Sequence, residues 1–122
     1  MLTLILIHIT LFSYIRAQSL YNHNSASYRN QTWMSTLDNG VPLRQLTIPG
    51  THSSMSTGTW GDAFQTQASS LSIQLASGIR ALDIRCRHYQ NGFPIHERLV
   101  YLNVDLGGVL TTVQNFLTTY PS

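Results

Sequence analysis

Two histidines, an aspartate and an arginine stand where their side chains could act together. His52 follows an apolar segment that ends in a proline and a glycine. Asp83 and Arg85 lie two residues apart near the end of a second apolar segment, and His96 ends a third. When such segments are parallel strands, their carboxyl ends meet on one face, and active sites are built there. The four side chains are therefore candidates for one cleft.

These residue types suit the transfer of a phosphoryl group. Two imidazoles can serve as general base and general acid, because they titrate near neutral pH. A guanidinium can stabilise charge that develops on phosphoryl oxygens with its planar set of donors. Asp83 lies on the same side of a strand as Arg85 and could orient the arginine or a histidine. The set indicates a reaction in which an alcohol attacks phosphorus.

Simpler interpretations of the same residues stay open. A histidine after a Pro-Gly turn is often an ordinary loop residue. An aspartate and an arginine two positions apart at a strand end often form a structural ion pair. The spacing alone does not separate these interpretations from a catalytic one.

The elements that would hold these residues alternate between strands and helices. Strands are predicted over residues 45–48, 79–85 and 93–96. Helices are predicted over residues 65–77 and 106–120, and a tight turn over residues 89–92. This order favours an α/β architecture with parallel pairing of strands.

Composition excludes several functional classes. The chain has 122 residues, which suits one small domain, and its 43% hydrophobic content is that of a globular protein. Seven basic residues, all arginine, oppose five acidic ones, so the formal net charge is only +2. No run of cations occurs, and a nucleic-acid partner is not expected.

The N-terminal segment predicts export. Residues 1–18 are interpreted as a signal peptide, because their apolar part is shorter than the roughly 20 residues that span a bilayer. A membrane anchor is the alternative. Residues 19–32 form a polar leader whose sequon, Asn30-Gln31-Thr32, fits a secreted protein. The single cysteine, Cys86, is expected to be a buried small hydrophobe, unless its partner lies outside this sequence.

Residues 33–122 resemble the X region of bacterial-type, metal-independent phosphatidylinositol-specific phospholipases C. The blocks that carry the resemblance are Trp33-Met34, Val41–Leu43, Leu46–Ser54, Gln74–Arg85, Pro94–His96, Val100–Leu102 and Phe116–Ser122. The resemblance implies a distorted (β/α)8 TIM barrel, a fold that takes roughly 250 residues. This chain would hold only the first strands and helices, as a truncated N-terminal part that is inactive by itself.

The resemblance also implies roles for individual residues. His52 would be the general base on the inositol 2-hydroxyl, which attacks phosphorus. Arg85 would neutralise the pentacoordinate transition state, and Asp83 would support the site. A second histidine, expected to be His96, would protonate the departing diacylglycerol oxygen and leave a cyclic inositol phosphate.

Two positions depart from the family pattern. Ser53 stands where the family has an aspartate after the first histidine. The family often has His-His-Gly around the second histidine, and counting back from Tyr101 puts Glu97 rather than His96 at the catalytic position. A loop shift of one residue would restore His96, and a carboxylic acid with a raised pKa could also serve.

No cofactor and no metal is expected. In the calcium-dependent branch of the family an acidic residue stands where this chain has Ala81, and Arg85 could replace the charge of the metal. Arg87 and Glu97 are expected to bind the substrate, a phospholipid at a membrane surface. The protein is expected to be a monomer.

Two other functions compete with the phospholipase. One is a catalytically degenerate secreted protein that binds inositol lipids on the same barrel. The other is a glycerophosphodiesterase or a relative of sphingomyelinase D, enzymes that rely on a metal held by carboxylates.

Overall fold

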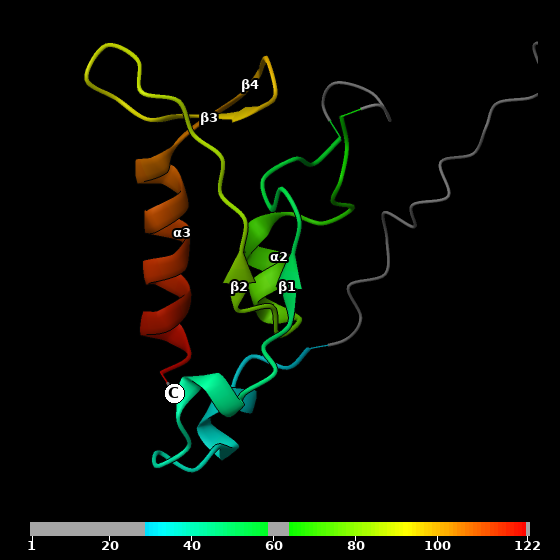
Figure 1. The fold of residues 1–122 in the computed structure, drawn as a ribbon, viewed down its shortest axis with the longest axis vertical. Helices are drawn as coiled ribbons and strands as arrows, with labels where there is room; N and C mark the ends of the chain where they lie inside the picture. Colours follow the sequence, from blue (N-terminus) through cyan, green and yellow to red (C-terminus); the bar gives the residue numbers. More distant parts are fainter. Residues whose placement is uncertain (1–28, 59–63, 122) are drawn as a thin grey trace, which may run out of the picture.

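The computed structural model describes residues 29–58 and 64–121 (Figure 1). The predicted signal peptide and most of the predicted leader lie outside the described residues. In chain order the elements are two 3-10 helices, η1 (Trp33–Thr36) and η2 (Leu43–Gln45), then β1 (Gly50–Thr51), α2 (Leu71–Ala76), β2 (Ala81–Leu82), β3 (Pro94–Glu97), β4 (Val100–Asp105) and α3 (Leu106–Thr119).

Strands β1 and β2 form a parallel pair, as the alternation of elements predicted. Gly50 pairs with Ala81, and Thr51 pairs with Leu82. A Cβ on Gly50 would lie 2.9 Å from the Cβ of Ala81, so only glycine permits this close approach. The pairing brings the carboxyl ends of two segments thirty residues apart to the same place.

Strands β3 and β4 form an antiparallel hairpin, which corrects the expectation of parallel pairing throughout. His96 pairs with Tyr101 and Glu97 with Val100 across the hairpin. The predicted turn is confirmed, since Tyr89 and Gly92 exchange backbone hydrogen bonds of 2.9 and 3.0 Å. Strand β4 was missed, although its residues alternate in burial as a half-buried strand does.

Two other predicted elements differ from the structure. The strand predicted over residues 45–48 is wrong, because η2 occupies its start and β1 begins only at Gly50. The helix predicted over residues 65–77 begins at Leu71, after a loop whose polar side chains bond to other segments. It ends as predicted before Gly78, whose φ of 105° favours glycine.

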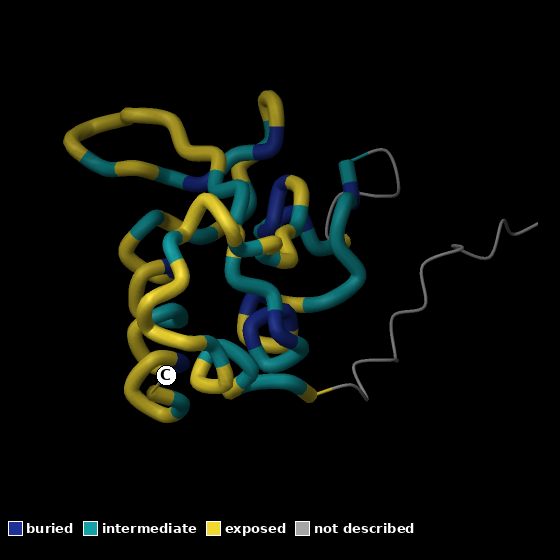
Figure 2. Tube along the Cα trace, turned by 60° about the horizontal axis from the view of Figure 1, so that its bottom comes forward, coloured by how far each residue is buried: buried dark blue, intermediate teal, exposed yellow. Residues whose placement is uncertain are grey.

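Helices α2 and α3 pack together and share a small core with β3. The buried apolar residues are Leu71, Leu75, Ile95, Val109 and Phe116. Figure 2 shows how short the buried stretches are against the exposed and half-buried remainder of the described chain. Arg80 links the two helices, because its guanidinium donates to the Leu75 carbonyl at 2.8 Å and lies 4.5 Å from the centre of the Phe116 ring.

The end of β4 leads directly into α3. Asp105 caps this helix, with its Oδ1 accepting a 2.8 Å hydrogen bond from the Gly108 amide. Cys86 is exposed, so the expectation of a buried cysteine is wrong. Among the helices of the described segments, none has the length and apolar character needed to cross a membrane.

Candidate active site

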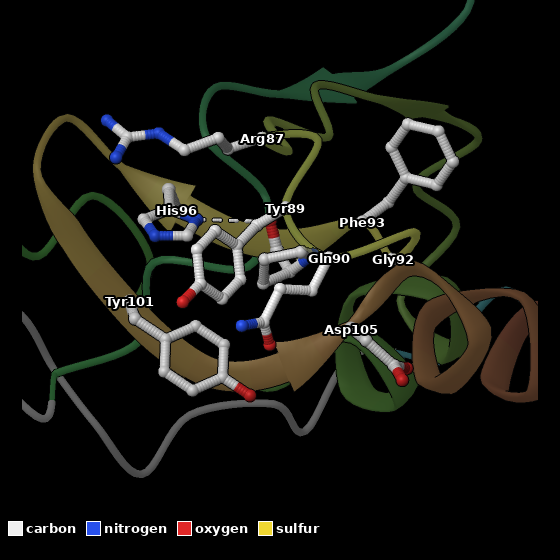
Figure 3. A pocket seen from close by; sticks show the side chains of 9 residues that line it. Arg87, Tyr89, Gln90, Gly92, Phe93, His96, Tyr101 and Asp105 are labelled. Carbon is white, nitrogen blue, oxygen red and sulfur yellow. Dashed lines mark hydrogen bonds between the residues drawn. The ribbon is translucent and has the colours of Figure 1, made fainter.

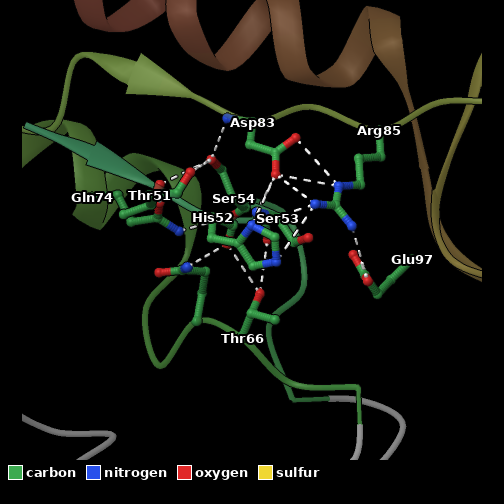
Figure 4. Close-up of polar contacts among 10 residues, drawn as sticks. Thr51, His52, Ser53, Ser54, Thr66, Gln74, Asp83, Arg85 and Glu97 are labelled. Carbon is green, nitrogen blue, oxygen red and sulfur yellow. Dashed lines mark hydrogen bonds and ion pairs between the residues drawn. The ribbon is translucent and has the colours of Figure 1, made fainter.

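His52 and Asp83 meet because each directly follows one strand of the parallel pair. The Nδ1 atom of His52 lies 3.2 Å from Oδ2 of Asp83 (Figure 4). The His52 ring remains 67% exposed, so a ligand can reach it. An open hollow of about 360 Å³ lies beside the two side chains, lined by both of them together with residues of β1 and β2.

Asp83 is the centre of the polar cluster. Its Oδ2 accepts hydrogen bonds from the Ser53 amide at 2.9 Å and from Nη2 of Arg85 at 2.9 Å. The Arg85 guanidinium, helped by the Ser53 amide, holds the pKa of Asp83 below its ordinary value of 3.8. Asp83 in turn raises the pKa of Arg85. Both groups are therefore charged at neutral pH.

Arg85 joins His52, Asp83 and Glu97. Its Nη2 atom lies 3.3 Å from Nδ1 of His52, and its Nη1 atom lies 3.4 Å from Oε1 of Glu97. Figure 4 shows the guanidinium between the His52 ring on one side and the Glu97 carboxylate on the other. The side chain is 42% exposed, so this cation can meet an anion from solvent.

Glu97 belongs to this cluster and His96 does not. Neighbouring residues of a strand point to opposite faces, and β3 buries Ile95 and Glu97 on the inner face. The Glu97 side chain is only 7% exposed and is aimed at Arg85. The structure thus brings together His52, Asp83 and Arg85 with Glu97 from the predicted set.

His96 and Arg87 lie on the opposite face of the hairpin. They line an open hollow of about 590 Å³ together with Tyr89 and Tyr101. Figure 3 shows the four side chains around this hollow, with Nδ1 of His96 3.1 Å from the Pro94 carbonyl oxygen. The His96 ring also lies against Tyr101, with 5.6 Å between the ring centres.

A buried polar network holds the segment that carries His52. Ser54 is fully buried, and its Oγ accepts a 2.9 Å hydrogen bond from the Asp83 amide. The side-chain Nε2 of Gln74 donates to the Ser54 carbonyl at 2.8 Å, and its Oε1 accepts from Thr51 Oγ1 at 2.7 Å. Helix α2 therefore fixes the loop after β1 through one buried side chain.

The loop before α2 holds the same segment from the other side. Thr66 Oγ1 and Gln67 Nε2 both donate to the His52 carbonyl oxygen, at 3.1 and 2.5 Å. Ser53 adopts a φ of 44°, which places its amide toward Asp83. Its Oγ is buried and has no hydrogen-bond partner among the described residues.

Sequence reasoning missed Ser54, Gln74 and Thr66 as parts of the site. Ser54 and Gln74 lie within the blocks that carry the family resemblance, which was the available signal. Their types suggest no chemistry, and only the fold shows that they support His52. No three histidine, cysteine, aspartate or glutamate side chains within residues 29–58 and 64–121 gather as a metal site would require.

Comparison with known proteins identifies the relatives of this chain. Over 115 residues it is 40% identical to a 1-phosphatidylinositol phosphodiesterase of Listeria monocytogenes, with 87% of this chain and 35% of that protein covered. Over 112 residues it is 34% identical to the protein of the same name from Staphylococcus aureus, with 85% and 35% covered. No protein-family model matches the sequence.

Solved structures agree with the sequence comparison. The phosphatidylinositol-specific phospholipase C of Listeria monocytogenes superposes with a TM-score of 0.66 at 40% identity, covering 76% of this chain and 35% of that one. A Staphylococcus aureus phospholipase C of the same specificity gives 0.71 at 35% identity, covering 80% and 34%. The chain spans about a third of the length of the relatives it matches.

Proposed function

This chain is homologous to bacterial phosphatidylinositol-specific phospholipases C over about 85% of its length, and we propose that the whole protein cleaves phosphatidylinositol or its glycosylated anchors. The observation that carries the proposal is the cluster of His52, Asp83 and Arg85 at the carboxyl ends of β1 and β2. When a hydroxyl attacks a phosphodiester, the reaction requires a base, a carboxylate that supports the base, and a cation.

His52 is the general base in this proposal. With its Nδ1–H donated to Asp83, the ring presents Nε2 to the inositol 2-hydroxyl and accepts its proton. The Asp83 carboxylate stabilises the imidazolium that results, at the 3.2 Å separation of Nδ1 and Oδ2. The oxygen of the deprotonated hydroxyl then forms the new bond to phosphorus.

Arg85 stabilises the charge that develops on the phosphoryl oxygens. It retains donor N–H groups that can face a ligand, because the side chain is partly exposed. Asp83 holds one edge of the guanidinium through Nε and Nη2, which limits the orientations that the cation can take. A preorganised donor of this kind acts without reorientation during the reaction.

Glu97 is assigned as the general acid in place of His96. Its carboxyl group lies in the cluster with Arg85, whereas His96 faces the other side of β3. Glu97 in its protonated form gives its proton to the diacylglycerol oxygen as the bond from that oxygen to phosphorus breaks. The products are diacylglycerol and a cyclic inositol phosphate. Water can then accept the proton that His52 took and give a proton back to Glu97.

The remaining parts of the proposal concern the whole protein. The chain supplies the N-terminal part of a distorted (β/α)8 barrel in a secreted monomer that acts at a membrane surface without a metal or cofactor. The support for the barrel is the parallel pair β1–β2 and the superposition on solved phospholipases. Arg87, on the far face of the hairpin, is not assigned to the substrate site.

A second candidate is a secreted protein that binds inositol lipids without cleaving them. One observation favours it. Within the described residues, His52 is the only histidine in the cluster around Asp83 and Arg85. Such a protein would retain Arg85 for the phosphate and would not need a proton donor.

The deciding experiment is cleavage of phosphatidylinositol by the full natural protein with EDTA present. We expect release of cyclic inositol phosphate from the wild type and its loss in His52→Ala. A folded wild-type protein that binds phosphatidylinositol vesicles and releases no product would contradict the phospholipase and support the binding protein.

A further inference from the structure

The hollow on the far face of the hairpin gathers polar side chains that the proposed function leaves unassigned. Its volume of about 590 Å³ is within the roughly 300–1,000 Å³ of small-molecule sites. Figure 3 shows Arg87 and His96 toward one end of the hollow, Asp105 toward the other, and Tyr89, Gln90 and Tyr101 between them. A ligand there would meet a cation at one end, a carboxylate at the other and aromatic rings in between.

The backbone carbonyl of Pro94 positions the two groups that can bind an anion. It accepts a hydrogen bond from the Arg87 amide at 3.0 Å, and its oxygen lies 3.1 Å from Nδ1 of His96. With Nδ1–H donated to this carbonyl, Nε2 of His96 is left to face a ligand. Arg87 is exposed and forms no ion pair with any residue in the ranges 29–58 and 64–121. Its guanidinium therefore has donors for a phosphate group.

The turn that forms one wall of the hollow is strained. Gln90 and Asn91 have φ values of 45° and 61°, and the backbones of Tyr89 and Gly92 exchange two hydrogen bonds across them. Asparagine tolerates this left-handed region, whereas glutamine is uncommon there. Backbone strain of this kind clusters at functional sites and ligand clamps. The Gln90 side chain lines the hollow, where its amide can both donate to and accept from a ligand hydroxyl.

The remaining lining residues suit a polyhydroxyl ring. Tyr89 is 59% exposed and Tyr101 is 44% exposed, so both aromatic rings can meet a ligand. The negative face of an aromatic ring attracts the C–H groups of a sugar, and the phenolic hydroxyl can bond to the hydroxyls of that sugar. Asp105 caps α3 through Oδ1, which leaves Oδ2 to accept from a further hydroxyl.

We propose that this hollow binds a small phosphorylated sugar. Arg87 and Nε2 of His96 hold the phosphate group, the tyrosine rings pack against the sugar, and Gln90 and Asp105 bond to its hydroxyls. The inference goes beyond the proposed function and does not depend on it, because none of these residues belongs to the cluster of His52, Asp83 and Arg85.

The test is calorimetric titration of the full natural protein with glucose 6-phosphate. We expect a dissociation constant on the order of 0.1–1 mM, because the hollow is open to solvent. Arg87→Gln should weaken binding about tenfold or more, since it removes a charged donor. Arg44→Gln, which removes an exposed arginine in η2, is the matched control and should bind as the wild type does. Equal binding by Arg87→Gln and the wild type would overturn the inference.

Two other ligands test the kind of molecule that binds. Glucose and inorganic phosphate should each bind more weakly than glucose 6-phosphate, because each makes only part of the contacts. Inorganic phosphate that binds as tightly as glucose 6-phosphate would contradict the sugar contacts and overturn the inference.

Two further variants separate the site from the fold and from the catalytic cluster. Gln90→Gly should weaken binding about twofold to tenfold without lowering the unfolding temperature, because glycine adopts a positive φ readily. His52→Ala should bind glucose 6-phosphate as the wild type does, and loss of binding there would place the ligand in the catalytic cluster and overturn the inference. A natural protein that cleaves no phosphatidylinositol, yet binds glucose 6-phosphate through Arg87, would contradict the phospholipase and support this site.

Discussion

Ser54 and Asp83 are joined by two hydrogen bonds that run in opposite directions. The Ser54 amide donates to the Asp83 carbonyl oxygen at 2.9 Å, and the Asp83 amide donates to Ser54 Oγ at 2.9 Å. These bonds connect the segment that follows β1 with the segment that follows β2, beyond the ends of the two strands. They set where the carboxylate of Asp83 stands relative to His52.

Replacing Ser54 with alanine should therefore destabilise the fold and displace the site. The Asp83 amide would lose its partner beside a fully buried side chain, at a cost of about 1–3 kcal/mol in the free energy of unfolding. Denaturant unfolding of Ser54→Ala and of Ser72→Ala, an exposed serine of α2, checks this. Equal stabilities of the two variants would show that the buried hydroxyl contributes nothing.

Replacing Gly50 with alanine should force the parallel pair apart. The added methyl group would lie 2.9 Å from Ala81 Cβ and 3.1 Å from its carbonyl oxygen. Overpacking of this kind costs about 1–3 kcal/mol, and here it would also separate His52 from Asp83. Gly92→Ala is the control, since the nearest atom to its added methyl group is 3.5 Å away. Thermal unfolding of both variants, and the activity of the whole protein, would measure the difference.

Asp83 should stabilise the folded protein down to acidic pH. Because its folded pKa lies below the ordinary value of 3.8, the carboxylate contributes stability that is fully present above that value. The contribution is lost as the pH falls through the lowered pKa. Unfolding of the wild type and of Asp83→Asn across pH 2 to 7 should show a stability difference that is constant near neutrality and shrinks only in the acid range. A difference that already shrinks as pH falls from 7 to 5 would contradict the lowered pKa.

Glu97 and His96 should differ sharply as catalytic residues. Loss of a general acid lowers kcat by about 10²–10⁴-fold, which is the expected result for Glu97→Gln in the whole protein. His96→Asn should leave kcat within a few-fold of the wild type, because its ring faces the hollow with Tyr101. The opposite pattern would assign the acid to His96 and require the hairpin to shift by one residue.

Sequence by itself determined which segments carry the cluster. The sequence indicates His52, Asp83 and Arg85, because each directly follows or ends an apolar segment bounded by glycine or proline, and parallel strands bring their carboxyl ends together. Local sequence rules suffice for these features because they depend on strand direction alone.

Only the tertiary structure shows which of His96 and Glu97 faces Arg85. The two residues are neighbours in one strand, and a change of register by one residue exchanges the face on which each lies. The antiparallel pairing with Val100 and Tyr101 sets that register, and it turns Glu97 toward Arg85. The exposure of Cys86 was decided in the same way, because whether a small hydrophobe is buried depends on what packs against it rather than on its own type.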